Sequence, residues 1–490
     1  METKAITIAI LAMGGEGGGV LADWITDLAE HCGFFAQTTS VPGVAQRTGA
    51  TIYYLEMFPE AAVRAAGQEP VLALMPVPGE LDIVIASELM EAGRAIDRGL
   101  VTPDRTTLIT STHRVYSMTE RTAISDGRVD AGKLLASGAA AKRFVYSDFA
   151  KIAAETGSVI SAVLFGALAA TEALPFSRAQ FEDSIRRSGV GVEPSLTAFA
   201  AGFQAAGQPP APTPQEQPVK LGPRLQQLAA RIESDFPPAS HAILLAGFQR
   251  LADYQDVRYA DEYLNRLEAI RTLDRDCGLL NEAARHLALW MSYEDTIRVA
   301  DLKTRRTRFE RVHREVRGNA SQVIQIREFL HPRVEEISDT LPAGLGRWLL
   351  RTAWARKLVE RFTKNGMVVQ TTSLSGFMML YGVAGLRRFR RKSLRFTIEQ
   401  QRIGEWLAQV ERLARNNYAL AVEIAECPQL LKGYGDTHHR GLRNFETIMA
   451  AVSTLEREQN GAASLKRLRE AALADENGET LAKALREVSA

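Results

Sequence analysis

The chain has 490 residues, 46% hydrophobic and 24% charged, a balance ordinary for a globular protein of two or three domains. Its formal net charge of +1 provides no overall field that would favour nucleic acid or a membrane surface as partner. The three cysteines, Cys32, Cys277 and Cys427, lie far apart in the sequence. They exclude a self-contained four-cysteine iron–sulfur cluster or zinc ribbon, and we expect no metal site.

The cysteine content and the N-terminus together predict a cytoplasmic protein. The N-terminal residues lead directly into a strand-like run, and no disulfide framework is apparent. Residues 365–386 are uncharged and long enough to span a membrane, but they contain a cluster of Gln, Thr and Ser. We therefore expect a buried helical segment or helix pair there, and no membrane partner.

The first 206 residues alternate between strand-like and helix-like segments. Several of the strand-like runs are almost continuously apolar, as in strands covered on both faces. This alternation predicts a Rossmann-like α/β domain over residues 1–206 with a mostly parallel sheet. The expected strands span 5–13, 34–40, 50–57, 81–88, 106–112 and 143–149.

The pattern changes after residues 207–223, a stretch rich in Pro and Gln that we interpret as a linker. From residue 224 onward, apolar residues recur at helical spacing, and charges of both signs occupy the other positions. The sequence therefore predicts an all-α domain over residues 224–490.

Five glycines, Gly14, Gly15, Gly17, Gly18 and Gly19, connect the first strand to the first helix. A strand–glycine–helix turn directs backbone N–H groups at an anion, although it also serves as a tight turn with close helix–sheet packing. Dinucleotide sites require an acidic residue after the next strand, and residues 36–51 contain none. No Lys-Ser/Thr pair follows the glycines either, so ordinary NAD, FAD and ATP sites are disfavoured.

A second glycine-containing loop, within residues 38–54, is dense in hydrogen-bond donors and includes one guanidinium, that of Arg47. It is either a ligand loop or a polar surface loop. The expected sheet places both loops at the carboxyl ends of strands, where α/β proteins bind ligands. Residues 110–116 follow another strand and can reach the same edge, but the sequence reveals no partner for His113.

Three segments in order carry a resemblance to a known family: AMGGEGGGVLADWI, TTSVPGVAQRTGATIYYLEM and LDIVIASELMEAGRAI. Residues 5–205 resemble the gamma-type domain of 2-oxoacid:ferredoxin oxidoreductases. The whole chain resembles the long form of the beta subunit of indolepyruvate ferredoxin oxidoreductase, which carries a helical C-terminal extension of unassigned chemistry.

The resemblance implies a heteromeric enzyme that decarboxylates arylpyruvates oxidatively and is inactive without its partner. Thiamine diphosphate and [4Fe-4S] clusters would lie on a separate alpha subunit, electrons would pass to ferredoxin, and coenzyme A would accept the acyl group. The alternative is a standalone α/β nucleotide- or ligand-binding regulatory protein whose helices bind partners.

The resemblance also implies which residues bind coenzyme A or the subunit face near thiamine; none is expected to be catalytic. They are Gly14, Gly15, Glu16, Gly17, Gly18, Ser40, Gln46, Arg47, Thr48 and Gly49. The family commonly has glutamine at the position of Glu16, and a carboxylate there opposes phosphate binding. Glu16 therefore points away, pairs with a cation such as Arg47, or marks a site that does not hold coenzyme A.

Two basic clusters, residues 303–318 and 386–396, stand out in the helical half. They are either solvated or intersubunit faces, or docking sites for acidic ferredoxin or the partner subunit. Nucleic acid is disfavoured because no recognition motif accompanies them. Residues 427–445 contain Asp436, His438 and His439, but without a third distant ligand we expect an ordered loop rather than a metal site.

Overall fold

A computed structural model of the chain describes residues 4–41, 50–67, 70–116, 120, 128–208, 222–316, 322–363, 366–431, 435–475 and 477–489. The chain divides into two compact units, Met1–Pro218 and Val219–Ala490. Each unit has its own hydrophobic core, and we call them the N-terminal unit and the helical unit.

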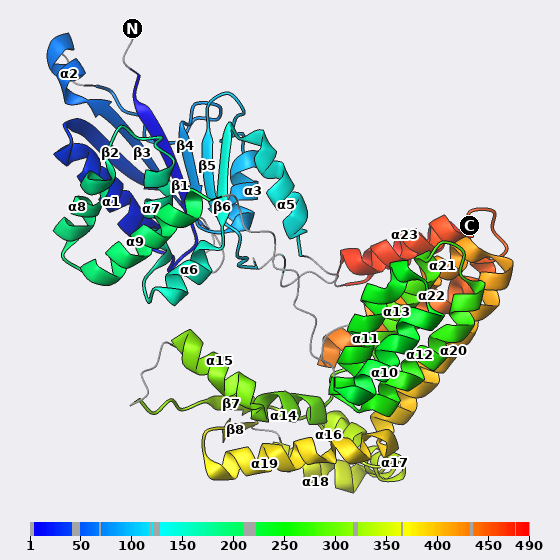
Figure 1. Cartoon of the computed structure of the whole chain (residues 1–490). Coiled ribbons are helices and arrows are strands. Elements are labelled where there is room, and N and C mark those ends of the chain that lie inside the picture. The colour runs from blue at the N-terminus through cyan, green and yellow to red at the C-terminus, as the bar shows by residue number, and fades with distance from the viewer. Residues whose placement is uncertain are drawn as a thin grey trace. The chain divides into compact units, whose positions relative to one another are not determined.

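The N-terminal unit is built on a six-stranded sheet with strand order β2-β3-β1-β4-β5-β6 (Figure 1). Its strands are β1 Ile6–Ala12, β2 Phe34–Val41, β3 Thr51–Pro59, β4 Ile83–Ala86, β5 Thr107–Ser111 and β6 Arg143–Ser147. Strands β1, β4, β5 and β6 pair in parallel, whereas β3 pairs antiparallel with both β1 and β2. The expected mostly parallel sheet is confirmed, but the second loop joins an antiparallel β2–β3 pair rather than a strand and a helix.

Helices cover both faces of this sheet. They are α1 Gly18–His31, α2 Glu60–Ala66, α3 Leu89–Asp97, α5 Ala131–Ser137, α6 Phe149–Glu155, α7 Ile160–Ala170, α8 Arg178–Ser188 and α9 Val192–Ala206, with a 3-10 turn η1 at Gly138–Ala140. Side chains of α1, α7, α8 and α9 pack on one face, and α3 packs on the other. The strands therefore read as continuous apolar runs because they are buried on both sides.

The carboxyl ends of β1 and β4 meet at the point where the chain reverses its direction across the sheet. After β1 the chain continues to β2 and β3 on one side, and from β4 it proceeds to β5 and β6 on the other. Open α/β sheets form ligand crevices at such a switch point. Val41 and Thr51, which flank the second loop, lie at this same edge.

The helical unit contains a bundle with a large continuous core. Figure 1 shows α11, α12, α13 and α20 running side by side. Its elements are α10 Pro223–Asp235, η2 Pro238–Ser240, α11 His241–Tyr254, α12 Val257–Leu273, α13 Gly278–Met291, α20 Leu394–Asn416, α21 Tyr418–Glu426, η4 Cys427–Leu430, α22 Gly435–Leu455, α23 Gly461–Ala474 and α24 Glu479–Ser489.

A second part of the helical unit, residues 296–392, is inserted between α13 and α20; we call it the basic lobe. Its elements are α14 Thr296–Thr304, α15 Arg306–Val316, β7 Arg327–Leu330, α16 Val334–Thr340, α17 Ala343–Arg351, α18 Ala353–Thr363, β8 Met367–Gln370, α19 Leu374–Gly385 and η3 Leu386–Lys392. Its cores are small: one contains Ala300, Val369 and Leu380, and the other Val334, Leu349 and Ala355. The all-α prediction therefore omitted one short antiparallel pair, β7–β8.

Two expectations for the helical half were wrong. The uncharged stretch near residue 375 forms β8 and α19, and most of α19 is exposed rather than buried, with Leu380 its one buried residue. The part of 427–445 that is described is helical, because η4 and α22 account for nearly all of it. Across the described ranges, no helix combines the length and apolar character that crossing a membrane requires.

Candidate functional site

The glycine loop adopts conformations that side chains would obstruct. Gly15 and Gly17 have φ values of 89° and 72°, in the left-handed region that favours glycine. A Cβ atom on Gly18 would lie 2.4 Å from that of Ala12 and 2.7 Å from the Tyr53 ring. The close helix–sheet packing that we had considered as an alternative to ligand binding is therefore present at Gly18.

The first half of the loop is open instead. A Cβ on Gly14 or Gly15 would meet no atom within 4 Å among the described residues. A Cβ on Gly17 would lie 2.9 Å from the hydroxyl oxygen of Ser161. That hydroxyl is buried and has no hydrogen-bond partner within the described part of the chain.

Glu16 pairs with His113, from the segment after β5. Glu16 Oε1 lies 3.1 Å from His113 Nε2, and the Ser87 hydroxyl donates a hydrogen bond to Glu16 Oε2. His113 Nδ1 lies 2.8 Å from the Ser111 hydroxyl. Residues from three strand ends thus meet at the switch point, and His113 is a described partner of the loop carboxylate; Arg47, which we named as a possible partner, lies outside the described residues.

Hydrogen bonding determines the protonation of this cluster. Burial raises the pKa of Glu16, but hydrogen bonds from His113 and Ser87 and the charge of His113 outweigh burial, so this pKa lies below its ordinary value. An ionised carboxylate only accepts hydrogen bonds, so His113 Nε2 must carry a proton. The pairing therefore holds an N–H group of His113 on the loop carboxylate.

A serine, a histidine and a carboxylate in line also suggest a nucleophilic triad, but burial rules out that chemistry. The Ser111 side chain has no exposed surface, and its hydroxyl also accepts a hydrogen bond from the Ala150 backbone at 3.3 Å. Glu16 and His113 retain 18% and 21% exposure. The groups that a ligand can reach are thus Glu16, His113 and the glycine backbone, which suits binding rather than covalent catalysis.

The structure describes part of the expected site. Gly14, Gly15, Glu16, Gly17 and Gly18 form the loop, and Ser40 is exposed near the end of β2, opposite Tyr53 on β3. Gln46, Arg47, Thr48 and Gly49 lie outside the described residues.

Ser87 and the Glu16–His113 pairing are the contributions that sequence reasoning missed. The sequence does show polar residues at the carboxyl ends of the expected strands that became β4 and β5. Only the strand order reveals that these residues converge on the end of β1.

The basic cluster at 386–396 is largely satisfied inside the helical unit. Arg390 is buried, pairs with Asp295 at 2.7 Å and donates to the Tyr254 carbonyl at 2.8 Å. Arg391 pairs with Glu262 at 2.6 Å. These arginines bind η3 to the bundle. They therefore form neither a solvent-exposed face nor a docking site.

Of the residues Asp436, His438 and His439, the first two pair with arginines. The Arg333 guanidinium pairs with Asp436 at 3.0 Å, and Arg395 Nη2 donates to His438 Nε2 at 2.7 Å. No group of three potential metal ligands occurs among the residues that the structure describes.

His438 predicts a specific pH dependence of stability. Burial, together with the charge of Arg395, lowers the pKa of His438 to about 4, so the folded state keeps it neutral. The unfolded chain binds a proton at its ordinary pKa near 6.5, so stability falls as pH drops from about 6.5 to about 4. We expect a loss of up to about 3 kcal/mol from this residue. His438→Gln should lose less unfolding free energy between pH 7.0 and pH 4.5 than the wild-type chain, as measured by urea unfolding at both pH values. An equal loss in the two proteins would contradict this prediction.

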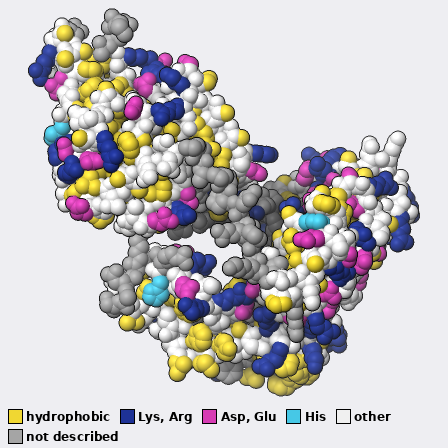
Figure 2. Space-filling view, in the orientation of Figure 1, with side chains coloured by type: hydrophobic (Ala, Val, Ile, Leu, Met, Phe, Trp, Pro, Cys, Tyr) yellow, Lys and Arg dark blue, Asp and Glu magenta, His cyan; other side chains and the backbone are white. Residues whose placement is uncertain are grey.

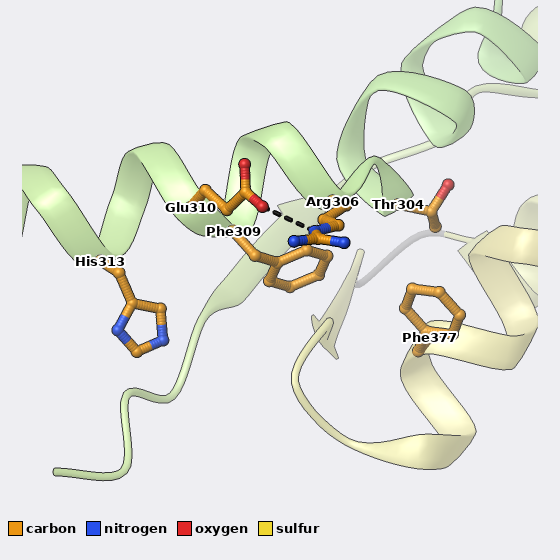
Figure 3. A pocket seen from close by; sticks show the side chains of 6 residues that line it. All are labelled: Thr304, Arg306, Phe309, Glu310, His313 and Phe377. Carbon is orange, nitrogen blue, oxygen red and sulfur yellow. Dashed lines mark hydrogen bonds and ion pairs between the residues drawn. The ribbon is translucent and has the colours of Figure 1, made fainter. Parts of the chain in front are cut away.

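A solvent-open hollow of about 550 Å³ lies between α15 and α19 in the basic lobe. It is lined by Thr304, Arg306, Phe309, Glu310, His313 and Phe377. Figure 3 shows Arg306 paired with Glu310, at 2.6 Å, while His313 points away from the phenyl rings. Because Arg306 is 92% exposed, these side chains form a surface hollow rather than an enclosed site.

Comparison with known proteins finds a family match for each of the two units. Residues 7–205 match the family described as pyruvate ferredoxin/flavodoxin oxidoreductase. The N-terminal unit is thus similar to this oxidoreductase family over almost its whole length. The resemblance of the glycine loop and its companion motifs to 2-oxoacid:ferredoxin oxidoreductases is therefore confirmed. Residues 240–451 match a family of unknown function, DUF6537.

Individual relatives of the 2-oxoacid:ferredoxin oxidoreductase domain come from several organisms. The chain is 26% identical over 212 residues to the indolepyruvate oxidoreductase subunit IorB of Thermococcus kodakarensis, covering 41% of this chain and 96% of that protein. A pyruvate oxidoreductase subunit of Thermotoga maritima is 16% identical, with a TM-score of 0.29 and coverage of 41% and 97%. The 2-oxoglutarate:ferredoxin oxidoreductase of Magnetococcus marinus is 16% identical, with a TM-score of 0.31 and coverage of 42% and 31%.

Proposed function

We propose that this chain is the beta subunit of an arylpyruvate, indolepyruvate-type, ferredoxin oxidoreductase. A partner alpha subunit carries thiamine diphosphate, which supports decarboxylation, and [4Fe-4S] clusters, which pass electrons to ferredoxin. The family match of residues 7–205 and the identity to an indolepyruvate oxidoreductase subunit support this proposal. The scattered cysteines of this chain agree with clusters held elsewhere.

This chain contributes a site for coenzyme A at the switch point of its sheet. The observation that carries this part is the Glu16–His113 pair, because the His113 N–H group occupies an oxygen of the carboxylate that would otherwise repel phosphate. The open backbone at Gly14 and Gly15 leaves room for a ligand, and the unpartnered Ser161 hydroxyl lies against the loop. These features fit an anionic group at the start of α1.

Reconstitution tests the proposed function. We expect the purified chain to be inactive alone and to support reduction of a viologen dye by indolepyruvate once the thiamine-binding subunit of the same organism is added. Full activity of this chain by itself, or no gain in activity from the added subunit, would contradict the proposal. Arylpyruvates should be compared with pyruvate and 2-oxoglutarate in the same assay.

The second loop has a separate test in the same complex. Arg47→Ala is expected to raise the KM for coenzyme A about tenfold, because a guanidinium binds phosphate bidentately. Arg64→Ala, at an exposed arginine of α2 paired with Glu60, is the control. An unchanged KM for coenzyme A in Arg47→Ala would remove this loop from the site.

A further inference from the structure

The helices α17 and α18 expose a set of large apolar side chains that we call the tryptophan face: Leu345, Trp348, Trp354 and Leu358. Their exposed fractions are 55%, 49%, 65% and 51%. Leu345 lies one helical turn before Trp348, and Leu358 one turn after Trp354, so each pair shares a helix side. The two indole rings contact edge to face, with centroids 5.7 Å apart, which makes the two sides continuous.

This part of the chain has few fully buried apolar side chains and several large exposed ones. The core beneath α16, α17 and α18 has three buried residues, Val334, Leu349 and Ala355. The neighbouring helix α19 is also largely exposed, with Leu374 and Tyr381 at 81% and 58%. Figure 2 shows hydrophobic side chains gathered over α19 and α18, with Lys and Arg beside them. Contiguous apolar surface of this kind marks an interaction site.

The charge around the tryptophan face is positive. The basic lobe contains 21 Lys and Arg against 8 Asp and Glu, whereas the remainder of the helical unit contains 22 against 26. No carboxylate among the described residues lies within ion-pair distance of four exposed cations on α17 and α18. These are Arg347, Arg351, Lys357 and Arg361.

These charges select the occupant. A second copy docking through the same face would bring like charges together, so self-association is disfavoured. Tryptophan and arginine are the residues that dominate protein–protein binding energy, and three of the four free cations are arginines, which bind carboxylates bidentately. Attraction to anionic lipid would not distinguish Arg from Lys. The exposed Leu345 and Leu358 also give an apolar surface that a nucleic acid backbone does not match.

We propose that the tryptophan face is a permanent docking surface for a protein with an apolar patch rimmed by carboxylates. The occupant is the thiamine-carrying subunit, an assignment that rests on the proposed function. Stable subunit interfaces are more apolar than the transient contacts of electron carriers, and this face has an apolar centre with charges around it. The helical unit thus holds the complex together, whereas the N-terminal unit contributes to the ligand site.

The test measures the affinity of the full chain for the thiamine-binding subunit of the same organism. Trp348→Ser with Trp354→Ser is expected to raise Kd about 30-fold or more, as for central hot-spot residues. Arg347→Glu with Arg351→Glu should raise Kd about tenfold at low salt and weaken its salt dependence. The controls are Leu289→Ser and Arg457→Glu with Lys466→Glu, at exposed positions of the bundle, and they should leave Kd unchanged.

Three outcomes overturn the inference. If the wild-type chain binds the subunit and both test variants bind equally well, the docking surface is elsewhere, and the proposed function stands. If the wild-type chain does not bind the subunit at all, the proposed function fails together with the assignment of this partner. If the variants assemble normally but lose binding to phosphatidylglycerol–phosphatidylcholine vesicles, the face is a lipid surface. Circular dichroism of each variant verifies that the fold is intact.

Discussion

Replacing His113 with alanine is expected to raise the KM for coenzyme A about 30-fold in the reconstituted complex. The replacement leaves the Glu16 carboxylate with the Ser87 hydrogen bond but without its histidine partner, next to the anion. Losing a hydrogen bond to a partly buried charged group costs about 2 kcal/mol, which corresponds to this change. Glu16→Gln should change the KM less than about threefold, because an amide still hydrogen-bonds and carries no charge.

The double variant separates charge from shape. Glu16→Gln in the His113→Ala background is expected to recover most of the lost affinity, giving a coupling free energy of about 2 kcal/mol in a double-mutant cycle. His31→Ala, at an exposed histidine at the end of α1, is the matched control. If the two single effects add without coupling, Glu16 and His113 do not act as a pair at the coenzyme A site.

The largest expected effect on stability comes from Gly166→Ala in α7. A Cβ on Gly166 would lie 2.0 Å from the carbonyl oxygen of Phe199 in α9, and one on Gly202 in α9 would lie 2.1 Å from the carbonyl oxygen of Val163 in α7. The two backbones approach through this reciprocal pair of glycines, and the obstructing atoms cannot rotate away. We expect the N-terminal unit to lose about 3 kcal/mol, since the helices must separate.

Gly404→Ala is expected to stabilise the chain, in contrast to Gly166→Ala. Gly404 lies inside α20, and a Cβ there would meet no described atom within 4 Å. Alanine should stabilise that helix by up to about 1 kcal/mol. Pulse proteolysis in urea, with fragments assigned by mass spectrometry, follows the two units separately. Equal stability of Gly166→Ala and the wild-type N-terminal unit would refute the close-approach argument.

The strands of the N-terminal unit were predictable because burial on both faces leaves continuous apolar runs in the sequence. All six expected strands are present, with bounds that differ by up to a few residues. The antiparallel position of β3 was missed, since apolar runs do not reveal strand direction. The Glu16–His113 pair was missed for a related reason: the two residues are 97 positions apart, and only the strand order brings them together.

The helical half was harder to predict because its composition does not reveal what each residue contacts. The arginines at 387–395 looked like a solvent face, but Arg390 is buried against Asp295, nearly one hundred residues earlier. The uncharged residues around α19 looked like a core, yet they are mostly exposed. Both errors have one cause: composition does not show that a charged side chain is buried against a distant partner or that an apolar side chain stays exposed.

Amide hydrogen exchange of the reconstituted complex, with and without coenzyme A, tests the central claim most directly. The claim is that the glycine loop and the Glu16–His113 pair form part of the coenzyme A site. We predict slower exchange on addition of coenzyme A in peptides covering residues 13–21 and 111–116. Protection confined to the partner subunit, with unchanged exchange in both segments of this chain, would contradict it.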